Sequence, residues 1–133
     1  MFEYLSKKKA LLVYTPLIAY WLILFTATSL PANDLPSIGL SDKINHLLAY
    51  FVLAILVYLA LLLQRKSKFL FNYAPAATLV ISLFYGIADE LHQMLIPGRS
   101  AEVFDWFADA TGVILGVLLV YYLKNRSKYQ PDF

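Results

Sequence analysis

Four long apolar segments restrict this chain to the folds that a lipid bilayer permits. They cover residues 10–30, 44–63, 69–88 and 103–123. A spanning helix needs about 20 apolar residues, because each residue adds about 1.5 Å and the hydrocarbon core is about 30 Å thick. With 133 residues, 60% of them hydrophobic, four such helices leave no room for a soluble domain. The sequence predicts an all-α polytopic membrane protein, a four-transmembrane-helix bundle forming a single domain over residues 1–133.

The first apolar segment also has features of a secretory signal peptide, with three lysines before it and small residues near Thr28 and Ala32. Its uncharged run of 21 residues is longer than the apolar region of a signal peptide, usually about 7–15 residues. We therefore expect this segment to be retained as the first membrane helix. Pro16 within it lacks a backbone donor and predicts a kink.

The charged residues are sorted between alternate connections, which share a side if all four segments span. Nine of the eleven Lys and Arg residues lie in the N-terminus, the second connection and the C-terminal tail. Seven of the nine acidic residues, among them Asp34, lie at the first and third connections or the adjoining helix ends, with Lys43 and Arg99. Because short connections rich in Lys and Arg stay in the cytoplasm, we predict that both termini are cytoplasmic and that the acidic side faces outward.

Composition excludes several classes of function. The chain has no cysteine, which rules out disulfides, Cys-ligated zinc and thiol catalysis. Its basic residues flank membrane segments rather than alternating with aromatics, so nucleic acid is not an expected partner. Membrane lipids are the expected surroundings.

The second segment begins with a polar stripe. Ser41 is a candidate N-cap, and Asp42 in the first turn suits the positive end of the helix dipole. Asp42, His46 and Tyr50 follow i, i+4 spacing and therefore project from one face. Such a stripe predicts a face turned toward the bundle interior or a water-filled pocket.

The third segment ends in Asp89, Glu90, His92 and Gln93, before a turn at Pro97-Gly98 and Arg99. Glu90 and Gln93 share a face, whereas Asp89 and His92, together with Glu102 farther along, are expected to face water at the membrane surface. The connection between the first two segments, residues 31–41, contains two prolines and a glycine that stop a helix.

The fourth segment is too short unless it includes acidic residues. Its uncharged part, 110–123, has 14 residues, roughly 21 Å of helix, and cannot cross the core. The helix must therefore include residues 104–109, which brings Asp105 and Asp109 to membrane depth, where they need partners. Lys43, His46 and Arg99 are the candidates. Gly112 and Gly116 form a small-xxx-small pair that allows close approach of another helix.

These residues allow four interpretations. His46 with Glu90 or Asp105 could be a base and its orienting carboxylate. Carboxylates with histidine could hold a divalent cation, although no HExxH-type spacing marks metal ligands and none are assigned. Arg99 and Lys43 could hold an anionic head while Gln93 and Tyr50 orient it. Finally, the group could be structural, joining helices by ion pairs and hydrogen bonds.

The motifs together resemble one known family. Asp42-Lys43-Ile-Asn-His46 with Tyr50, then Glu90-Leu-His-Gln93, Pro97-Gly98-Arg99 and Asp105 with Asp109, Gly112 and Gly116 are similar to the VanZ-like membrane proteins. The resemblance covers residues 41–116. It implies a small multi-pass protein of the bacterial plasma (inner) membrane, from a family whose namesake is associated with resistance to teicoplanin.

The resemblance also implies a functional set of residues at the motif positions. We assign tentative catalytic roles to His46, Glu90 and Asp105, and ligand binding to Asp42, Lys43, Tyr50, Gln93, Arg99 and Asp109. The expected function is binding of a lipid-linked or amphipathic envelope molecule in an outward pocket, without a required cofactor, and with a link to glycopeptide resistance. The alternatives are a membrane-embedded hydrolase or transferase acting on a lipid head, and a structural or partner-binding protein. An ion path is disfavoured, since the cytoplasmic halves of the helices lack ionisable residues.

Overall fold

The computed structural model describes residues 1–31 and 41–131, and every regular element in these two ranges is helical. The predicted all-α fold is confirmed. Residue Asp34 and most of the first connection, residues 32–40, lie outside the described residues.

Four helices are long and apolar enough to span a membrane, as predicted. They are α2 (Thr15–Ser29), α3 (Asp42–Leu63), α5 (Ala74–Gln93) and α6 (Val103–Ser127). A π-helical turn, Ala10–Tyr14, extends α2 to a span of 20 residues. This wider turn directly precedes Pro16, which lies in the first turn of α2, where its missing N–H leaves no helical hydrogen bond unmade; the kink stays a prediction.

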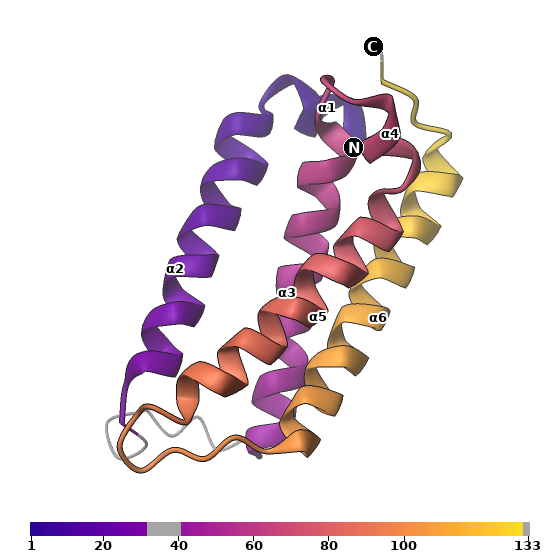
Figure 1. The fold of residues 1–133 in the computed structure, drawn as a ribbon. Helices are drawn as coiled ribbons and strands as arrows, with labels where there is room; N and C mark the ends of the chain where they lie inside the picture. The colour runs from indigo at the N-terminus through magenta and orange to yellow at the C-terminus, as the bar shows by residue number, and fades with distance from the viewer. Residues whose placement is uncertain (32–40, 132–133) are drawn as a thin grey trace.

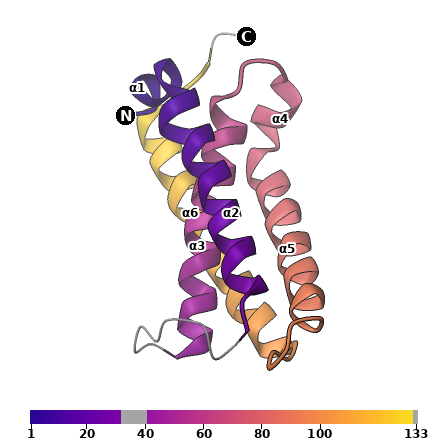
Figure 2. The same cartoon turned by 90° about the vertical axis from the view of Figure 1, so that its left-hand side faces the viewer.

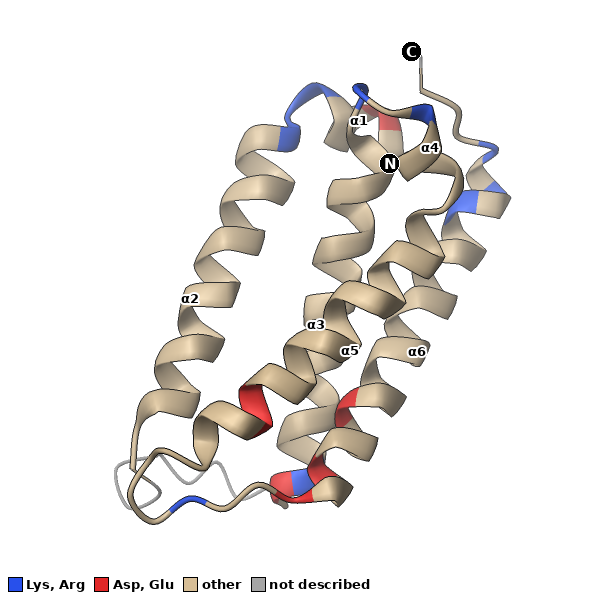
Figure 3. Cartoon of the chain, viewed as in Figure 1, with Lys and Arg blue, Asp and Glu red and all other residues tan. Residues whose placement is uncertain are grey.

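The four spans alternate in direction, so both chain ends lie at one end of the bundle (Figures 1 and 2). Two short helices, α1 (Phe2–Lys7) and α4 (Lys68–Asn72), lie at that same end. Figure 3 shows Lys and Arg concentrated there and most acidic residues toward the other end. The chain therefore has a basic end, which carries the termini, and an acidic end.

The third span begins later than predicted. Residues 69–73 belong to α4 and to a break at Tyr73, and the spanning helix α5 starts at Ala74. Pro75 is the reason, because in a continuous helix its ring would clash with the carbonyl of Phe71 and it offers no N–H to bond there. At the second position of a new helix, a missing N–H costs nothing.

Two glycines bring α6 against α3. A Cβ at Gly112 would overlap the backbone carbonyl of Leu47, and one at Gly116 would lie 2.7 Å from the carbonyl oxygen of Phe51. The predicted close approach is thus realised with α3 as the partner. Buried aliphatic side chains such as Leu53 and Val113 fill the rest of this contact.

The buried face of α5 is made of small and polar residues at four-residue intervals: Ala74, Thr78, Ser82, Gly86 and Glu90. Small side chains let α5 lie close to its neighbours. Near its end, the carboxyl groups of Asp89 and Glu90 are buried. Helix α2 has a single buried residue, Leu24. It is joined to α3 by the Tyr20 hydroxyl, which donates to the Ala49 carbonyl at 2.9 Å.

Candidate functional site

A group of ionisable side chains is buried between three helices at the acidic end. We call it the polar cluster: His46, Asp89, Glu90, Asp105 and Asp109, each at most 9% exposed. The first turns of α3 supply His46, the last turn of α5 supplies Asp89 and Glu90, and the first turns of α6 supply the other two. Alternating helix directions bring these three ends together.

His46 lies between two carboxylates. Its Nδ1 is 2.9 Å from Oδ1 of Asp109, a hydrogen-bonding distance, and 4.0 Å from Oε1 of Glu90. Asp109 is 1% exposed and Glu90 7%. Asp109 is thus buried inside the bundle with His46, one of its candidate partners, beside it, whereas its depth in the membrane stays a prediction.

Glu90 also fixes the start of α6. Its Oε2 accepts the backbone N–H of Glu102, the N-cap residue, at 2.9 Å. A carboxylate at a helix N-terminus interacts favourably with the helix dipole. The other oxygen, Oε1, and Oδ2 of Asp109 are buried and have no hydrogen-bond partner among residues 1–31 and 41–131.

Lys43 holds the outer edge of the cluster. Its ammonium group contacts Asp105 and lies 2.6 Å from Oε2 of Glu102. Asp42 is exposed in the first turn of α3. Ser41, the residue before it, is the N-cap of this helix, and its hydroxyl accepts a hydrogen bond from the Ile44 N–H at 3.4 Å. The expected N-cap is confirmed, and Lys43 is engaged by two carboxylates.

Two residues expected to face water are packed instead. Asp89 is 6% exposed and accepts a hydrogen bond from the Tyr50 hydroxyl at 3.3 Å. His92 lies against α2, where its Nε2 is 3.0 Å from Ser29 Oγ and its ring stacks on Phe25. The prediction was wrong for Asp89, while His92 is half-buried, because the end of α5 packs against neighbouring helices and is not a free surface. Glu102 is half-exposed, as expected.

Among the described residues, Arg99 contacts the end of α2 rather than an acidic residue. Its Nη2 donates to the Ala27 carbonyl at 3.0 Å and its Nε to that of Leu30 at 3.3 Å, so the guanidinium satisfies the last carbonyls of α2. Its Nη1 lies 3.5 Å from Oε1 of Gln93. No ion pair joins Arg99 to a carboxylate within the described ranges. The structure brings His46, Glu90, Asp105 and Asp109 together, whereas Arg99 lies against the end of α2 and contacts Gln93.

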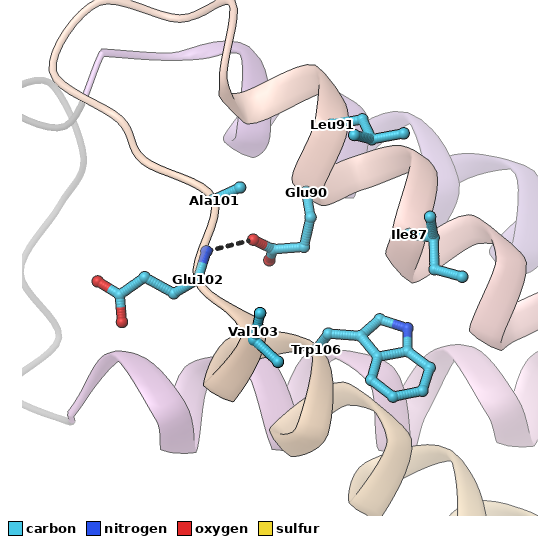
Figure 4. A pocket seen from close by; sticks show the side chains of 7 residues that line it. All are labelled: Ile87, Glu90, Leu91, Ala101, Glu102, Val103 and Trp106. Atoms are coloured by element: carbon cyan, nitrogen blue, oxygen red, sulfur yellow. Dashed lines mark hydrogen bonds between the residues drawn. The ribbon is translucent and has the colours of Figure 1, made fainter.

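A cavity of about 340 Å³, which we call the groove, lies between the end of α5 and the start of α6 (Figure 4). Its walls are mostly apolar, and the lining residues are Ile87, Glu90, Leu91, Ala101, Glu102, Val103 and Trp106. The carboxyl group of Glu90 points across the cavity toward the segment that leads into α6 (Figure 4). Since Leu91 and Val103 are exposed on the outer surface of the bundle, the cavity connects that surface with Glu90.

This arrangement suits two kinds of chemistry. A histidine held by one carboxylate, with a second carboxylate nearby, can take and return a proton. The same groups can bind a cation: ligand atoms of His46, Glu90 and Asp109 lie within 4.8 Å of one another, as do those of Asp42, His46 and Asp105.

Sequence reasoning missed Asp89 and the apolar groove beside Glu90. The four-residue repeat of small and polar residues along α5 was a signal that one face of this helix is buried to its end. No sequence signal was available for Trp106 as a wall of the groove, because its place depends on how α5 crosses α6.

Comparison with known proteins agrees with the motifs. The model of the VanZ/LLP1 family matches residues 5–124. Uncharacterized protein C11E3.10 of Schizosaccharomyces pombe is 27% identical over 121 residues, covering 90% of this chain and 68% of the relative. No solved structure matches the chain.

Proposed function

Because the chain belongs to the VanZ/LLP1 family and is a multi-pass membrane protein, we propose that it binds an amphipathic lipid of the cell envelope. The apolar part of the ligand lies in the groove between α5 and α6, and the polar head meets the polar cluster. The observation that carries this proposal is the groove itself, which has apolar walls and a buried carboxyl group, Glu90, at its inner side.

The groove supports a lipid better than a soluble ligand. Ligand sites combine mostly apolar walls with a few placed polar groups, and here Leu91 and Val103 are exposed where acyl chains surround the bundle. A lipid can therefore enter sideways from the bilayer, without first crossing water.

The charges of the cluster favour a particular head. We expected Lys43 and Arg99 to hold an anion, but Lys43 is engaged by two carboxylates and Arg99 by carbonyls of α2. Four buried acids face one histidine and one lysine. The cluster as it stands accepts a cation or a group that donates hydrogen bonds.

An enzyme acting on the same lipid is the second candidate, favoured by the contact between His46 and Asp109. In a hydrolase or transferase, Asp109 would orient the imidazole, and His46 or Glu90 would remove a proton from the attacking hydroxyl or water. Either activity would alter surface chemistry and, in a bacterial plasma membrane, susceptibility to teicoplanin-type glycopeptides.

The test is lipid retention by the purified protein. Leu91→Trp fills the groove, whereas Leu118→Trp makes the same change at a lipid-facing site of α6 with similar exposure, 56% against 59%. We expect native mass spectrometry to find a lipid on the wild type and on Leu118→Trp, and several-fold less on Leu91→Trp. Equal lipid on all three proteins would contradict the proposal.

The same sample separates binding from catalysis. The protein is incubated with membrane lipid extract, with and without divalent metal, and the products are analysed by mass spectrometry. A retained but unchanged lipid supports binding, and a product that Glu90→Gln abolishes supports the enzyme. A folded protein that neither retains nor changes lipid would contradict both and favour a structural or partner-binding role.

A further inference from the structure

We infer that His46, Glu90 and Asp109 form a binding site for one divalent transition-metal cation. The three residues come from α3, α5 and α6, so no sequence spacing within a single helix predicts this metal site. The inference concerns the cation alone and holds whether or not a lipid occupies the groove.

The separations suit a single cation. Atoms that bind one cation at about 2.0–2.2 Å lie no more than about 4.4 Å apart. Nδ1 of His46 is 2.9 Å from Oδ1 of Asp109 and 4.0 Å from Oε1 of Glu90. Both separations fall in this range. The two carboxylates also lie within 4.8 Å of one another, close to the limit.

The unpaired oxygens are a second, independent observation. Oε1 of Glu90 and Oδ2 of Asp109 have no hydrogen-bond partner in the described part of the chain, although both side chains are more than nine-tenths buried. A buried carboxylate without a compensating charge is strongly unfavourable, more so at membrane depth. A dication between the two carboxylates would supply the missing charge.

The surroundings favour this trio over the neighbouring one. The N–H of Glu102 holds the other oxygen of Glu90, which fixes its orientation as outer partners of metal ligands do. Beside Oδ2 of Asp109, Gly86 leaves the room that a side chain would occupy. In the neighbouring trio, Asp42 is exposed and Asp105 is already paired with Lys43.

The donor set selects the kind of cation. One imidazole with two carboxylates suits Zn²⁺, Mn²⁺, Co²⁺ or Fe²⁺, whereas Mg²⁺ and Ca²⁺ prefer oxygen ligands alone. Three protein ligands also leave coordination positions for a ligand. A bound dication would offset most of the negative charge of the cluster and offer an open coordination position to a phosphate-bearing head.

Co²⁺ alone is the probe for the test. The full-length protein is purified in detergent, stripped with a chelator and titrated with Co²⁺ while its visible absorption is recorded. We expect one Co²⁺ per chain, displaced by Zn²⁺ and not by Mg²⁺. Glu90→Gln and Asp109→Asn should each weaken binding at least about tenfold, since even outer partners of metal ligands contribute about 10–100-fold.

Glu102→Gln is the matched control, because it removes an exposed acid from the same end of the bundle without removing a proposed ligand, and it should leave the affinity unchanged. Asp42→Asn tests the neighbouring trio, in which Asp42 lies near His46, and should weaken binding less than either ligand variant. Absence of Co²⁺ binding by the wild type, or unchanged affinity in both ligand variants, would overturn the inference. So would loss of binding in Asp42→Asn, which would indicate the neighbouring trio.

X-ray absorption of the Zn²⁺-loaded wild type gives a reading that needs no variant. One imidazole among oxygen ligands is expected, and purely oxygen coordination would refute the site even if the ligand variants fail to fold. Lipid retention in the stripped protein is measured separately, so that failure of the metal site and failure of the lipid proposal remain distinct.

Discussion

Lys43 supplies the positive charge that makes a buried Asp105 tolerable. Asp105 is only 3% exposed, and the ammonium of Lys43 is in contact with it while also pairing with the half-exposed Glu102. Removing one partner of a buried pair leaves an uncompensated charge, whereas loss of an exposed pair has little effect. The two contacts of one lysine should therefore differ in their effect on stability.

Lys43→Met should lower the Tm markedly, because Asp105 remains buried without a counter-charge. Glu102→Gln, which removes only the exposed partner, should change the Tm little. Thermal unfolding in detergent, followed by circular dichroism, measures both variants. Equal effects of the two substitutions would show that Asp105 does not depend on Lys43.

The residues of the cluster were largely identifiable from sequence, as were Lys43 and His46 as partners of Asp105 and Asp109, but the other contacts were not. Helix length required Asp109 to be at depth, and i, i+4 spacing placed His46 and Tyr50 on one face. That Tyr50 bonds Asp89, and that Arg99 bonds α2 rather than an acid, depends on the packing of separate helices. Local patterns in a sequence carry no information on that packing.

At the scale of helices, the close approach of α6 to α3 sets the geometry of the cluster. Gly112 is one turn beyond Asp109 on α6, and the space for its Cβ is taken by the carbonyl of Leu47, one residue after His46 on α3. The contact between His46 and Asp109 therefore lies beside the tightest point between these two helices.

Gly112→Ala should destabilise the bundle by about 1–3 kcal/mol, as overpacking does. At an uncrowded helical position the same change would stabilise by about 1 kcal/mol, because alanine favours helix. Thr111→Ala, at the exposed neighbouring position, should stay within about 0.5 kcal/mol. Denaturant unfolding in mixed micelles measures both, and a more stable Gly112→Ala would contradict the close contact.

The spans themselves were predictable because the bilayer prescribes their length. The starts of α3 and α6 agree with the sequence signals. For α3 the signal was Ser41 as N-cap, and for α6 it was the need to include the turns with Asp105 and Asp109 so that the helix is long enough to cross the membrane. The start of α5 was not predicted, since an apolar run from Phe69 continues through the break at Tyr73. Only Pro75 marked that break, and prolines are also tolerated within membrane helices.

On the scale of the whole molecule, the sorting of charge puts the polar cluster near one membrane surface. Both termini and most Lys and Arg residues are at the opposite end (Figure 3). If the basic end is cytoplasmic, the cluster and its groove face outward, where an envelope lipid can reach them. The orientation of the bundle therefore decides whether the proposed ligand has access to the site.

Cysteine labelling in intact cells tests this orientation directly, because the chain has no cysteine of its own. Lys66→Cys introduces an exposed thiol at the basic end, and Ser100→Cys one at the acidic end. With a membrane-impermeant maleimide, we predict labelling of Ser100→Cys in intact cells and of Lys66→Cys only after the membrane is opened. If only Lys66→Cys were labelled in intact cells, the bundle would have the opposite orientation, which would contradict an outward-facing site.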